Sequence, residues 1–360
     1  VLNELEDNQI LIVDAIKGEV IVSPDAETLQ LYKEKREGFL KEKEELKTLK
    51  DKEAVSKDGI KVDVWGNIGS PNDVKGIISN GGFGIGLYRT EFLFMEKESF
   101  PTEDEQFEAY KIVAEELKGY PVTIRTMDIG GDKELPYLDL PKELNPFLGY
   151  RAIRISLENK NMFKTQLRAI LRASQYGQIK IMYPMISSIN EIRKANAILE
   201  ECKKELDEIG KIYDRNIKVG IMVETPSTAI IAYKFAKEVD FFSIGTNDLT
   251  QYFLAVDRGN EMVSTLYNSF NPAVLEAIQK VIDAAHDANI NVSMCGEFAG
   301  DKKATKLLLG MGLDSFSMSA SSGLQVKKII RNSSYVDAQK YRDLVLQQNT
   351  PEEVLEHLLP

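Results

Sequence analysis

From residue 60 onward, short β-rich apolar runs alternate with helical patterns, and this alternation constrains the fold more than any other feature of the chain. Eight such runs can be counted: Lys61–Asn67, Gly84–Arg89, Val122–Asp128, Ile179–Met185, Val219–Glu224, Phe241–Asp248, Asn291–Glu297 and Ser315–Ser319. Strands separated by helices form a parallel sheet, and eight of them are the number needed to close a barrel. The sequence therefore predicts an α/β protein with a (β/α)8 TIM barrel.

Start signals for helices lie between these runs. They are two capping boxes and one N-cap followed by proline: Thr102 with Glu105, Ser188 with Glu191, and Asn271 before Pro272. An open doubly wound sheet is the alternative to a barrel. The glycines of residues 81–86 do not support it, because they lie before and within a strand, whereas a dinucleotide fingerprint opens a helix after a strand.

The first 54 residues have a different character. Two short strands, Ile10–Val13 and Val20–Val22, turn at Lys17 and Gly18 and are too few to form a domain. Residues 27–53 combine dense charge with a thin apolar stripe, which predicts a long, mostly solvated helix. This helix is either a surface helix of the main domain or a linker between two domains. We expect residues 1–26 to be the remnant of an N-terminal domain, 27–54 a linker helix and 55–360 the barrel.

Composition excludes several classes of function. The 360 residues are 43% hydrophobic and 28% charged, as in soluble globular proteins. The net charge of −11 argues against non-specific nucleic-acid binding, which needs clustered Lys and Arg. No stretch approaches the roughly 20 apolar residues of a membrane span, so we expect no membrane insertion and a cytoplasmic location. Cys202 and Cys295 have neither disulfide nor zinc-site spacing.

Polar residues close five of the predicted strands. A TIM barrel carries its active site at the carboxyl ends of its strands, so these residues are the first candidates for function. They are Arg89, Arg125 with Asp128, Glu224, Asn247 with Asp248, and Cys295 with Glu297. Any one of them alone is explained by a strand-end salt bridge or a cap. Five strands ending in this way indicate a functional site, because unpaired charge is costly in a barrel mouth.

The chemistry of these candidates points to an anionic ligand and a metal ion. Arg89, Arg125 and Arg258 carry guanidinium groups suited to bidentate contact with phosphate or carboxylate. Glu224 and Asp248, expected on adjacent strands, would supply two carboxylates for Mg²⁺, with Mn²⁺ also possible. Without an anion site the same pair could serve as the acid and base of a glycosidase, but the arginines argue against that.

Two further residues have two interpretations each. Cys295 is either a small core residue or, at a strand end beside Gly296, a general acid. Lys133, in the segment Gly130-Gly131-Asp132-Lys133, either joins the phosphate site or is an ordinary loop lysine. Cys202 lies in the charged segment EECKKE and is interpreted as incidental.

Seven motifs together suggest a family. They are GIGLYRTEFLF (84–94), RTMDIGGDK (125–133), NPFLGYRAIRI (145–155), MVETP (222–226), GTNDLTQY (245–252), DRGN (257–260) and MCGEFAGD (294–301). In this order they resemble the C-terminal phosphoenolpyruvate-binding domain of Enzyme I of the bacterial sugar phosphotransferase system, a phosphoenolpyruvate-protein phosphotransferase, across residues 55–360. Pyruvate phosphate dikinase and phosphoenolpyruvate synthase share the barrel and several motifs. The direct run from RTMDIGGDKELPYLDLPKE into NPFLGYRAIRI, and AVDRGN, are closer to Enzyme I.

The resemblance implies a role for each candidate. Arg89, Arg125 and Arg258 would hold phosphoenolpyruvate with help from Asn247, and Arg151 would lie near the same pocket. Glu224 and Asp248 would bind Mg²⁺ beside the substrate, and Cys295 would protonate C3 of the enolpyruvate. The resemblance also implies a homodimer, and phosphoryl transfer to a histidine of a separate phosphohistidine domain and then to the phosphocarrier HPr for sugar uptake. Residues 1–24 would be the end of that phosphohistidine domain.

The two histidines of the chain do not match the acceptor. The family's acceptor lies in a Gly-Gly-x-Thr-Ser-His context, whereas His286 lies in AAHDANI and His357 in LEHLLP. We therefore expect this chain to bind phosphoenolpyruvate but to lack the residue that receives the phosphoryl group. A barrel kept only as a dimerisation or sensing module is the non-catalytic alternative. The intact set of arginines, carboxylates and thiol argues against it.

Overall fold

The computed structural model describes residues 5, 9–15, 17–95, 97–131, 135–138 and 140–358. The chain forms two compact units, Val1–Leu49 and Lys50–Pro360. In the first unit β1 (Leu11–Asp14) pairs antiparallel with β2 (Glu19–Val22) through a turn in which Gly18 has a φ of +71°. The helix α1 (Ala26–Lys47) follows, capped by Asp25, and buries none of its residues. It is therefore the solvated helix that the sequence predicted, although it ends six residues earlier than residue 53.

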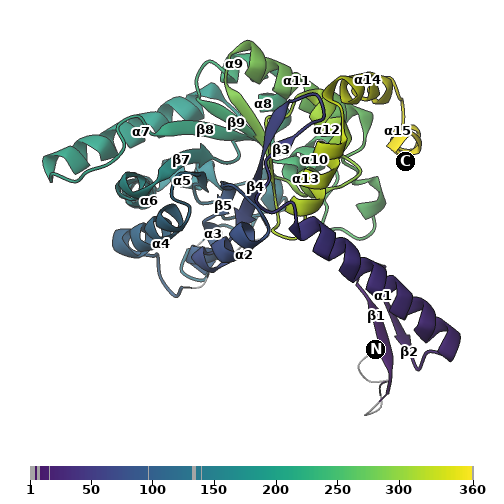
Figure 1. Ribbon diagram of the computed structural model, residues 1–360. Helices are drawn as coiled ribbons and strands as arrows, with labels where there is room; N and C mark the ends of the chain where they lie inside the picture. Colours follow the sequence, from purple (N-terminus) through teal and green to yellow (C-terminus); the bar gives the residue numbers. More distant parts are fainter. Residues whose placement is uncertain are drawn as a thin grey trace. The chain divides into compact units, whose positions relative to one another are not determined.

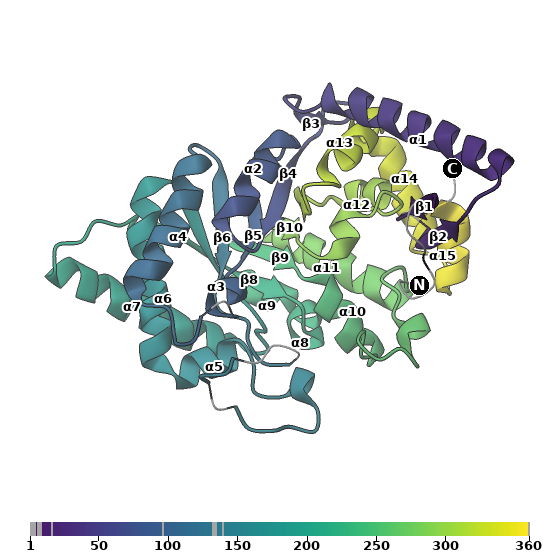
Figure 2. The same ribbon diagram turned by 90° about the horizontal axis from the view of Figure 1, so that it is seen from below.

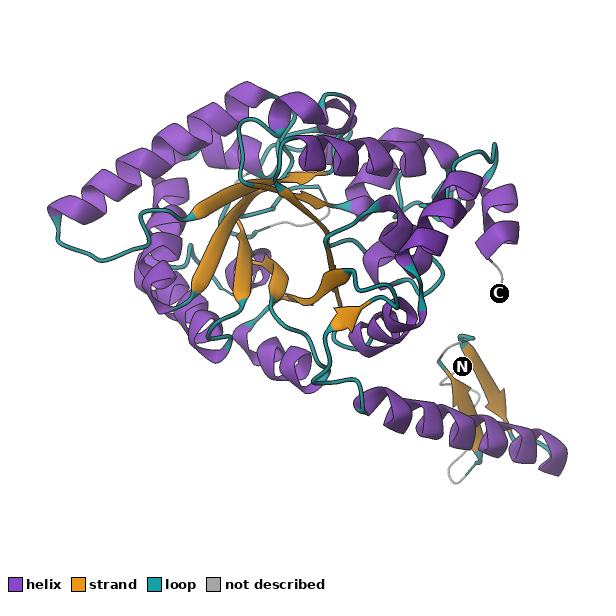
Figure 3. Cartoon of the chain, turned by 45° about the horizontal axis from the view of Figure 1, so that its top comes forward, coloured by secondary structure: helices purple, strands orange, loops and turns teal. Residues whose placement is uncertain are grey.

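The second unit contains a closed barrel of eight parallel strands (Figure 3). The strands are β4 (Lys61–Ile68), β5 (Ile85–Arg89), β6 (Pro121–Arg125), β7 (Gln178–Tyr183), β8 (Lys218–Val223), β9 (Phe241–Ile244), β10 (Asn291–Met294) and β11 (Ser315–Met318). Each strand pairs with the next in chain order, and β11 pairs with β4 to close the ring. The short β3 (Ala54–Val55) adds antiparallel to β4. The prediction of a TIM barrel is confirmed, and closure excludes the open sheet.

Helices surround the barrel (Figures 1 and 2). They are α2 (Val74–Ser79), α3 (Glu91–Met95), α4 (Glu103–Glu116), α5 (Ile153–Glu158), α6 (Lys160–Ala173), α7 (Ile189–Glu208), α8 (Pro226–Ile230), α9 (Ala232–Phe235), α10 (Thr246–Leu254), α11 (Pro272–Asp287), α12 (Thr305–Met311), α13 (Gly323–Asn332), α14 (Tyr335–Val345) and α15 (Pro351–Leu358). The three predicted start signals are all present, before α4, α7 and α11. None of the helices in the described part of the chain is long and apolar enough to span a membrane.

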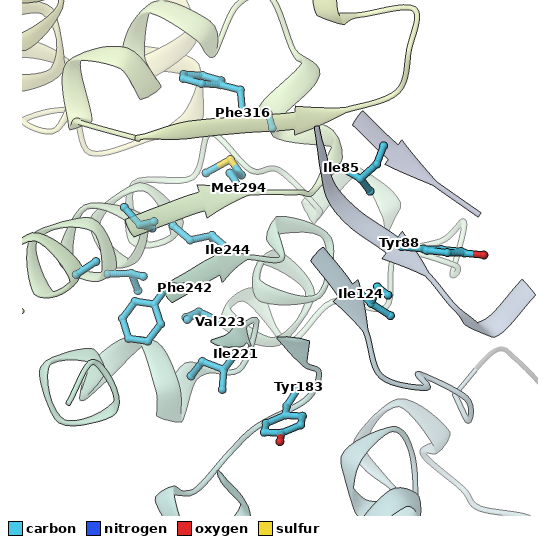
Figure 4. Packing of buried hydrophobic residues seen from close by; sticks show 14 of the residues in the cluster. Ile85, Tyr88, Ile124, Tyr183, Ile221, Val223, Phe242, Ile244, Met294 and Phe316 are labelled. Carbon is cyan, nitrogen blue, oxygen red and sulfur yellow. The ribbon is translucent and has the colours of Figure 1, made fainter. Parts of the chain in front are cut away.

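Side chains alternate between the two faces of each strand, and this alternation places the polar residues. Ile221 and Val223 of β8 belong to the large apolar cluster between the strands and the helices (Figure 4). Met222 belongs to a smaller cluster with Leu87, Met182, Phe241 and Cys295. Because successive side chains of a strand point to opposite faces, Glu224 follows Met222 into the barrel interior. The packing of the outer face therefore fixes which residues reach the mouth.

Three predicted strands end three or four residues earlier in the structure than the sequence indicated, and three others end one or two residues earlier. β6 ends at Arg125, β9 at Ile244 and β10 at Met294. Asn247 and Asp248 consequently lie in the first turn of α10, and not on a strand adjacent to that of Glu224. The chain turns out of β9 at Gly245, where a Cβ would come within 3.0 Å of Glu224 Oε2. Glycine thus allows the start of α10 to approach Glu224 closely.

Candidate functional site

A pocket of about 430 Å³ opens at the carboxyl ends of the strands. The structure brings eight of the predicted site residues together around it: Arg89, Arg125, Arg151, Glu224, Asn247, Asp248, Arg258 and Cys295. Glu91, Asp128 and Tyr267 also line it. Lys133, the remaining candidate, lies outside the described residues.

Arg125 is buried between two carboxylates. Its Nη2 lies 2.5 Å from Oε1 of Glu91, and its Nη1 lies 2.9 Å from Oδ2 of Asp128. Only 7% of the Arg125 side chain and 1% of each carboxylate side chain are exposed. A buried guanidinium is tolerated only when its charge is compensated in this way. The two carboxylates therefore hold the Arg125 side chain at the edge of the pocket.

Arg151 is the second buried cation of the mouth. Its Nη2 lies 3.0 Å from Oδ1 of Asp128 and 3.5 Å from Oδ2 of Asp248, and its Nη1 donates to the hydroxyl of Tyr252 at 3.1 Å. Asp128 thus bridges Arg125 and Arg151, one carboxylate oxygen to each. Because Tyr252 and Asp248 lie one turn apart on α10, this helix carries two of the contacts that orient Arg151.

Arg89 and Arg258 are less enclosed than the other two arginines. Arg89 ends β5 and is half-buried in the pocket wall. The Arg258 side chain is 32% exposed, and its Nη2 lies 3.9 Å from Oδ1 of Asp248. Compared with Arg125 and Arg151, these two side chains have more freedom to reach a ligand in the pocket.

Glu224 is fully enclosed beside the pocket. One of its oxygens accepts a hydrogen bond from the backbone N–H of Met185 at 2.6 Å. Burial raises the pKa of Glu224 to about 8, and the negative charges of Asp248 and Asp128 add to this effect, against Arg125 and Arg151. A cation bound beside Glu224 would therefore lower its pKa and favour the ionised carboxylate.

Asp248 supplies the second carboxylate of a possible metal site. Its Oδ1 is buried and has no hydrogen-bond partner among the described residues. No group of three or more His, Cys, Asp and Glu side chains in the described ranges is arranged to hold a metal ion. Two carboxylates suit Mg²⁺ when substrate oxygens and water complete the octahedron. The orphaned oxygen of Asp248 and the enclosed Glu224 fit such an ion.

Asn247 joins α10 to the turn that follows β10. Its Oδ1 accepts from the backbone N–H of Glu297 at 3.0 Å, and its Nδ2 donates to Oε1 of Glu297 at 3.5 Å. The hydroxyl of Tyr267 donates to the Asn247 carbonyl at 3.0 Å. The first turn of α10 and the segment after β10 that carries Cys295 are therefore joined by hydrogen bonds at the mouth.

The thiol of Cys295 faces the pocket from just beyond β10 and is 2% exposed. Its Sγ lies 3.7 Å from the carbonyl oxygen of Ile244, to which it donates. Burial raises the pKa of Cys295, while a hydrogen bond from Ser243 and the charge of Arg125 lower it. The net shift is upward, so the thiol keeps its proton at neutral pH and can serve as an acid.

The other cysteine and the histidines lie elsewhere. Cys202 is buried in the shell of helices, where its thiol donates to the Lys164 carbonyl at 3.8 Å and burial raises its pKa to about 12. His286 lies in the last turn of α11, and its Nε2 lies 3.2 Å from Oδ1 of Asp314, which precedes β11. It is thus at the amino ends of the strands, opposite the pocket. His357 is exposed on α15.

Sequence reasoning missed several residues of the mouth. Glu91 was not considered, although an acidic residue two positions after Arg89 in an otherwise apolar segment was the available signal. Tyr252 and Tyr267 carry no local signal, because their contacts depend on how α10 and the following loop pack.

Comparison with known proteins gives this site a family. Residues 43–335 match the family model of the PEP-utilising enzyme, PEP-binding domain. The chain is 55% identical over 351 residues to a phosphoenolpyruvate-protein phosphotransferase from Bacillus subtilis (strain 168), covering 98% of this chain and 62% of the relative. The proteins of the same name from Priestia megaterium and Haemophilus influenzae are 54% identical over 356 residues and 57% over 344. These matches cover 99% and 96% of this chain and 62% and 60% of the two relatives.

The chain belongs to the PEP-utilising enzymes, and it carries their phosphoenolpyruvate-binding domain. The family resemblance drawn from the seven motifs is confirmed. The chain spans about three fifths of the length of the curated relatives that it matches.

Proposed function

We propose that the chain binds phosphoenolpyruvate with Mg²⁺ and forms the substrate-cleaving half of a phosphoenolpyruvate-protein phosphotransferase. The observation that carries the proposal is the pocket itself, where four arginines, five carboxylates that include Glu224 and Asp248, and a protonated thiol converge in a phosphoenolpyruvate-binding domain. An acidic chain with a net charge of −11 needs such a local cluster to attract an anion. The names of the relatives support a phosphotransferase over a dikinase or synthase.

Each side chain has a part in substrate binding. Arg89 and Arg258, the more exposed pair, approach the phosphate and carboxylate of phosphoenolpyruvate. Arg125 and Arg151, held by Asp128, supply fixed positive charge, and Asn247 assists beside them. Glu224 and Asp248 would hold Mg²⁺, which would polarise the phosphate and enolate oxygens when bound, and Mn²⁺ could take its place.

The chemistry divides between a phosphoryl step and a proton step. A histidine Nε2 attacks the phosphorus in line, so that the N–P bond forms while the bond from phosphorus to the enol oxygen breaks. The arginines neutralise the charge on the phosphoryl oxygens as the group transfers. The pyruvate enolate left behind takes the Cys295 proton at C3 and becomes pyruvate. The resulting thiolate regains a proton from water after pyruvate leaves.

The acceptor histidine has to come from another domain. His286 and His357 do not line the pocket, and His286 lies at the other end of the barrel. We infer that a phosphohistidine domain delivers it, with residues 1–26 as part of that domain and residues 27–54 as its linker helix. That domain would pass the phosphoryl group to HPr for sugar uptake, in the cytoplasm and without nucleic acid or membrane insertion.

A homodimer is part of the same proposal. Loops at the pocket end expose apolar side chains: Leu144 is 99% exposed, Met262 89%, Leu148 65% and Leu266 62%. Exposed apolar residues are typical of an interaction surface, although Ile209 and Ile212, which precede β8, are 65% and 70% exposed at the other end of the barrel. A second copy of the barrel is the partner that the family resemblance implies.

A calorimetric titration tests the proposed function. Phosphoenolpyruvate is titrated into the chain with Mg²⁺ and, separately, with a chelator. We expect binding that requires the metal. Absence of binding in both titrations would refute the assignment, and equal binding in both would refute the role of the two carboxylates.

A further inference from the structure

A chain of buried side-chain hydrogen bonds runs behind the two strands that end in Arg89 and Arg125. Gln166 of α6 accepts from the backbone N–H of Met127 at 2.9 Å and donates through Nε2 to the hydroxyl of Thr90 at 3.1 Å. The Thr90 hydroxyl in turn donates to the Arg125 carbonyl at 2.8 Å. Gln166 is 2% exposed and Thr90 is fully buried.

The donor and acceptor roles in this hydrogen-bond network are fixed by the two backbone groups at its ends. The N–H of Met127 can only donate, so the oxygen of the Gln166 amide must face it. The Arg125 carbonyl can only accept, so the Thr90 proton must point to it. The lone pairs of the Thr90 hydroxyl then accept from Gln166 Nε2. Each group in the network can therefore act as donor or acceptor in only one way. Such a fully satisfied buried network favours a single arrangement of the groups that it joins.

This network of side-chain hydrogen bonds connects β5 and β6 beyond the point where their backbone pairing ends. Arg89 of β5 and Arg125 of β6 form the last registered pair between these strands. Beyond them the backbones must diverge, because Glu91 begins α3 while residues 126–131 lead into a loop. Thr90 and Gln166 bond to the two segments just where the strand ladder stops. They therefore fix the separation of two backbones that carry site residues.

Both segments carry members of the charge cluster around Arg125. Glu91 directly follows Thr90, and Asp128 directly follows Met127. These are the two carboxylates that contact the Arg125 guanidinium at 2.5 and 2.9 Å. A shift of either segment would change how Glu91 and Asp128 hold Arg125 and, through Asp128, Arg151.

The Gln166 amide is itself held from behind. The same Nε2 lies 3.3 Å from the hydroxyl of Tyr110, which donates to Oε1 of Gln106 at 3.2 Å. Gln106 then donates to the Pro101 carbonyl at 3.0 Å. Tyr110 and Gln106 are buried on α4, so the network reaches from α4 through α6 to the barrel mouth.

We propose that Gln166 and Thr90 are positioning residues that set the arginines of the pocket for phosphoenolpyruvate without touching the ligand. Neither side chain is among those that line the pocket in the described part of the chain. The inference rests on the proposed function, because its effect is measured as affinity for phosphoenolpyruvate and Mg²⁺. A displacement of about 1 Å at a distance from the chemistry can cost on the order of 100-fold, so a fixed backbone separation matters here.

The test measures phosphoenolpyruvate affinity in the presence of Mg²⁺ by calorimetry, well below the unfolding temperature of each variant. Thr90→Val keeps the shape of the side chain but removes the hydroxyl, whereas Thr90→Ser keeps the hydroxyl. Thr305→Val is the matched control, because Thr305 is equally buried, its hydroxyl donates to the Asp301 carbonyl at 3.0 Å, and it is not among the described residues that line the pocket. Gln166→Met removes the amide at similar length.

We expect Thr90→Val and Gln166→Met each to weaken binding by about 10-fold or more. Thr90→Ser and Thr305→Val should bind like wild type, and the variant with both Thr90→Val and Gln166→Met should be no weaker than its worse parent, because the two changes break one network. If Thr90→Val does not fold, the affinity of Gln166→Met for phosphoenolpyruvate tests the proposal by the same criterion. The affinity of Thr90→Ser is still measured and compared with that of wild type.

The results separate the two proposals. If wild type shows no metal-dependent binding, the proposed function fails before any variant is compared. If wild type binds and Gln166→Met and Thr90→Val bind as tightly as Thr305→Val, the positioning role is refuted while the function stands. Equal losses in Thr90→Val and Thr90→Ser would also refute it, because packing and not the hydroxyl would then be responsible.

Discussion

At the carboxyl ends of the strands Arg125 is buried between two carboxylates, whereas near the amino ends Lys327 is buried against two backbone carbonyls. The Lys327 ammonium donates to Lys50 O at 3.0 Å and Gly81 O at 2.9 Å and lies 4.5 Å from the centre of the Phe83 ring. These two carbonyls are neutral dipoles that join segments of the chain, and Asp51 and Arg331 act on the ammonium through their charge.

The difference shows how one fold separates binding from stability. In the mouth, charges of both signs are packed together, so adding or removing an ion or an anionic ligand changes every neighbouring interaction. Near the amino ends, Lys327 and Arg331 of α13 fasten residues 50–53 through backbone carbonyls. We therefore expect changes in the mouth to alter chemistry, and changes at the other end to alter the free energy of unfolding.

The largest expected effect concerns whether phosphoenolpyruvate bound at the carboxyl ends of the strands can phosphorylate a histidine of this chain. An acceptor must come within about 3–3.5 Å of the reacting phosphorus, and His286 is held at the opposite end beside Asp314. We predict that the chain incubated with ³²P-labelled phosphoenolpyruvate and Mg²⁺ acquires no label on alkaline gels. Adding the phosphohistidine domain of a relative as a separate polypeptide should restore weak transfer, because no tether raises its effective concentration. Stoichiometric label on His286 or His357 would overturn the division between the two ends.

The next prediction compares the two buried cysteines. Cys295→Ala, introduced into a full-length relative, should bind phosphoenolpyruvate normally but lower kcat by roughly 10²–10⁴-fold, as for the loss of a general acid. Cys202→Ala is the control, because its thiol is buried away from the pocket. Single-turnover measurements separate pyruvate formation from phosphoryl transfer. Unchanged pyruvate formation in Cys295→Ala would make this thiol structural, like that of Cys202.

The metal site should show a smaller but decisive loss. Glu224→Ala or Asp248→Ala should weaken Mg²⁺-dependent binding of phosphoenolpyruvate by about 2–5 kcal/mol, part of it from charge left unpaired. Titration calorimetry gives the affinity, and thermal unfolding of the same samples shows that the fold is retained. Glu238→Ala, which removes a carboxylate paired with Arg193 on the surface, is the control. Binding within threefold of wild type by both site variants would argue against the two carboxylates as ligands.

The smallest effect is a pH dependence near the amino ends. Burial lowers the pKa of Lys327 to about 8 from an ordinary value of 10.5. Between these two pH values the unfolded chain binds more protons at this group than the folded chain, so the free energy of unfolding rises with pH. Wild type should therefore gain roughly 1–3 kcal/mol relative to Lys327→Met between pH 7.5 and 10.

Denaturant unfolding at several pH values measures this difference. Arg331→Met is the matched control, because Arg331 lies one turn further along α13 and donates to the Glu53 carbonyl at 2.7 Å without titrating in this range. A flat difference between wild type and Lys327→Met, like that expected for Arg331→Met, would show that Lys327 keeps an ordinary pKa.

The sequence by itself determined the barrel and the chemical kinds of residue at its mouth. Apolar runs of strand length, with helix caps between them, are local patterns, and eight of them specify the number of strands directly. A TIM barrel carries its site at the carboxyl ends of its strands, so Glu224, which closes the strand that ends in Val223, could be assigned to the mouth. Arg89, Arg125 and Cys295 were found by the same reasoning.

The tertiary structure corrected the ends of several strands, and it alone decided which side chains contact the arginines. The strand predicted from Phe241 was too long, because Gly245 and Thr246 interrupt its apolar composition after Ile244 and α10 begins at Thr246. Glu91 meets Arg125 across 34 residues of chain, and Gln166 meets Thr90 across 76. Because such partners are chosen by the packing of α3 and α6 against the closed ring, their identity is a property of the folded barrel and not of any segment.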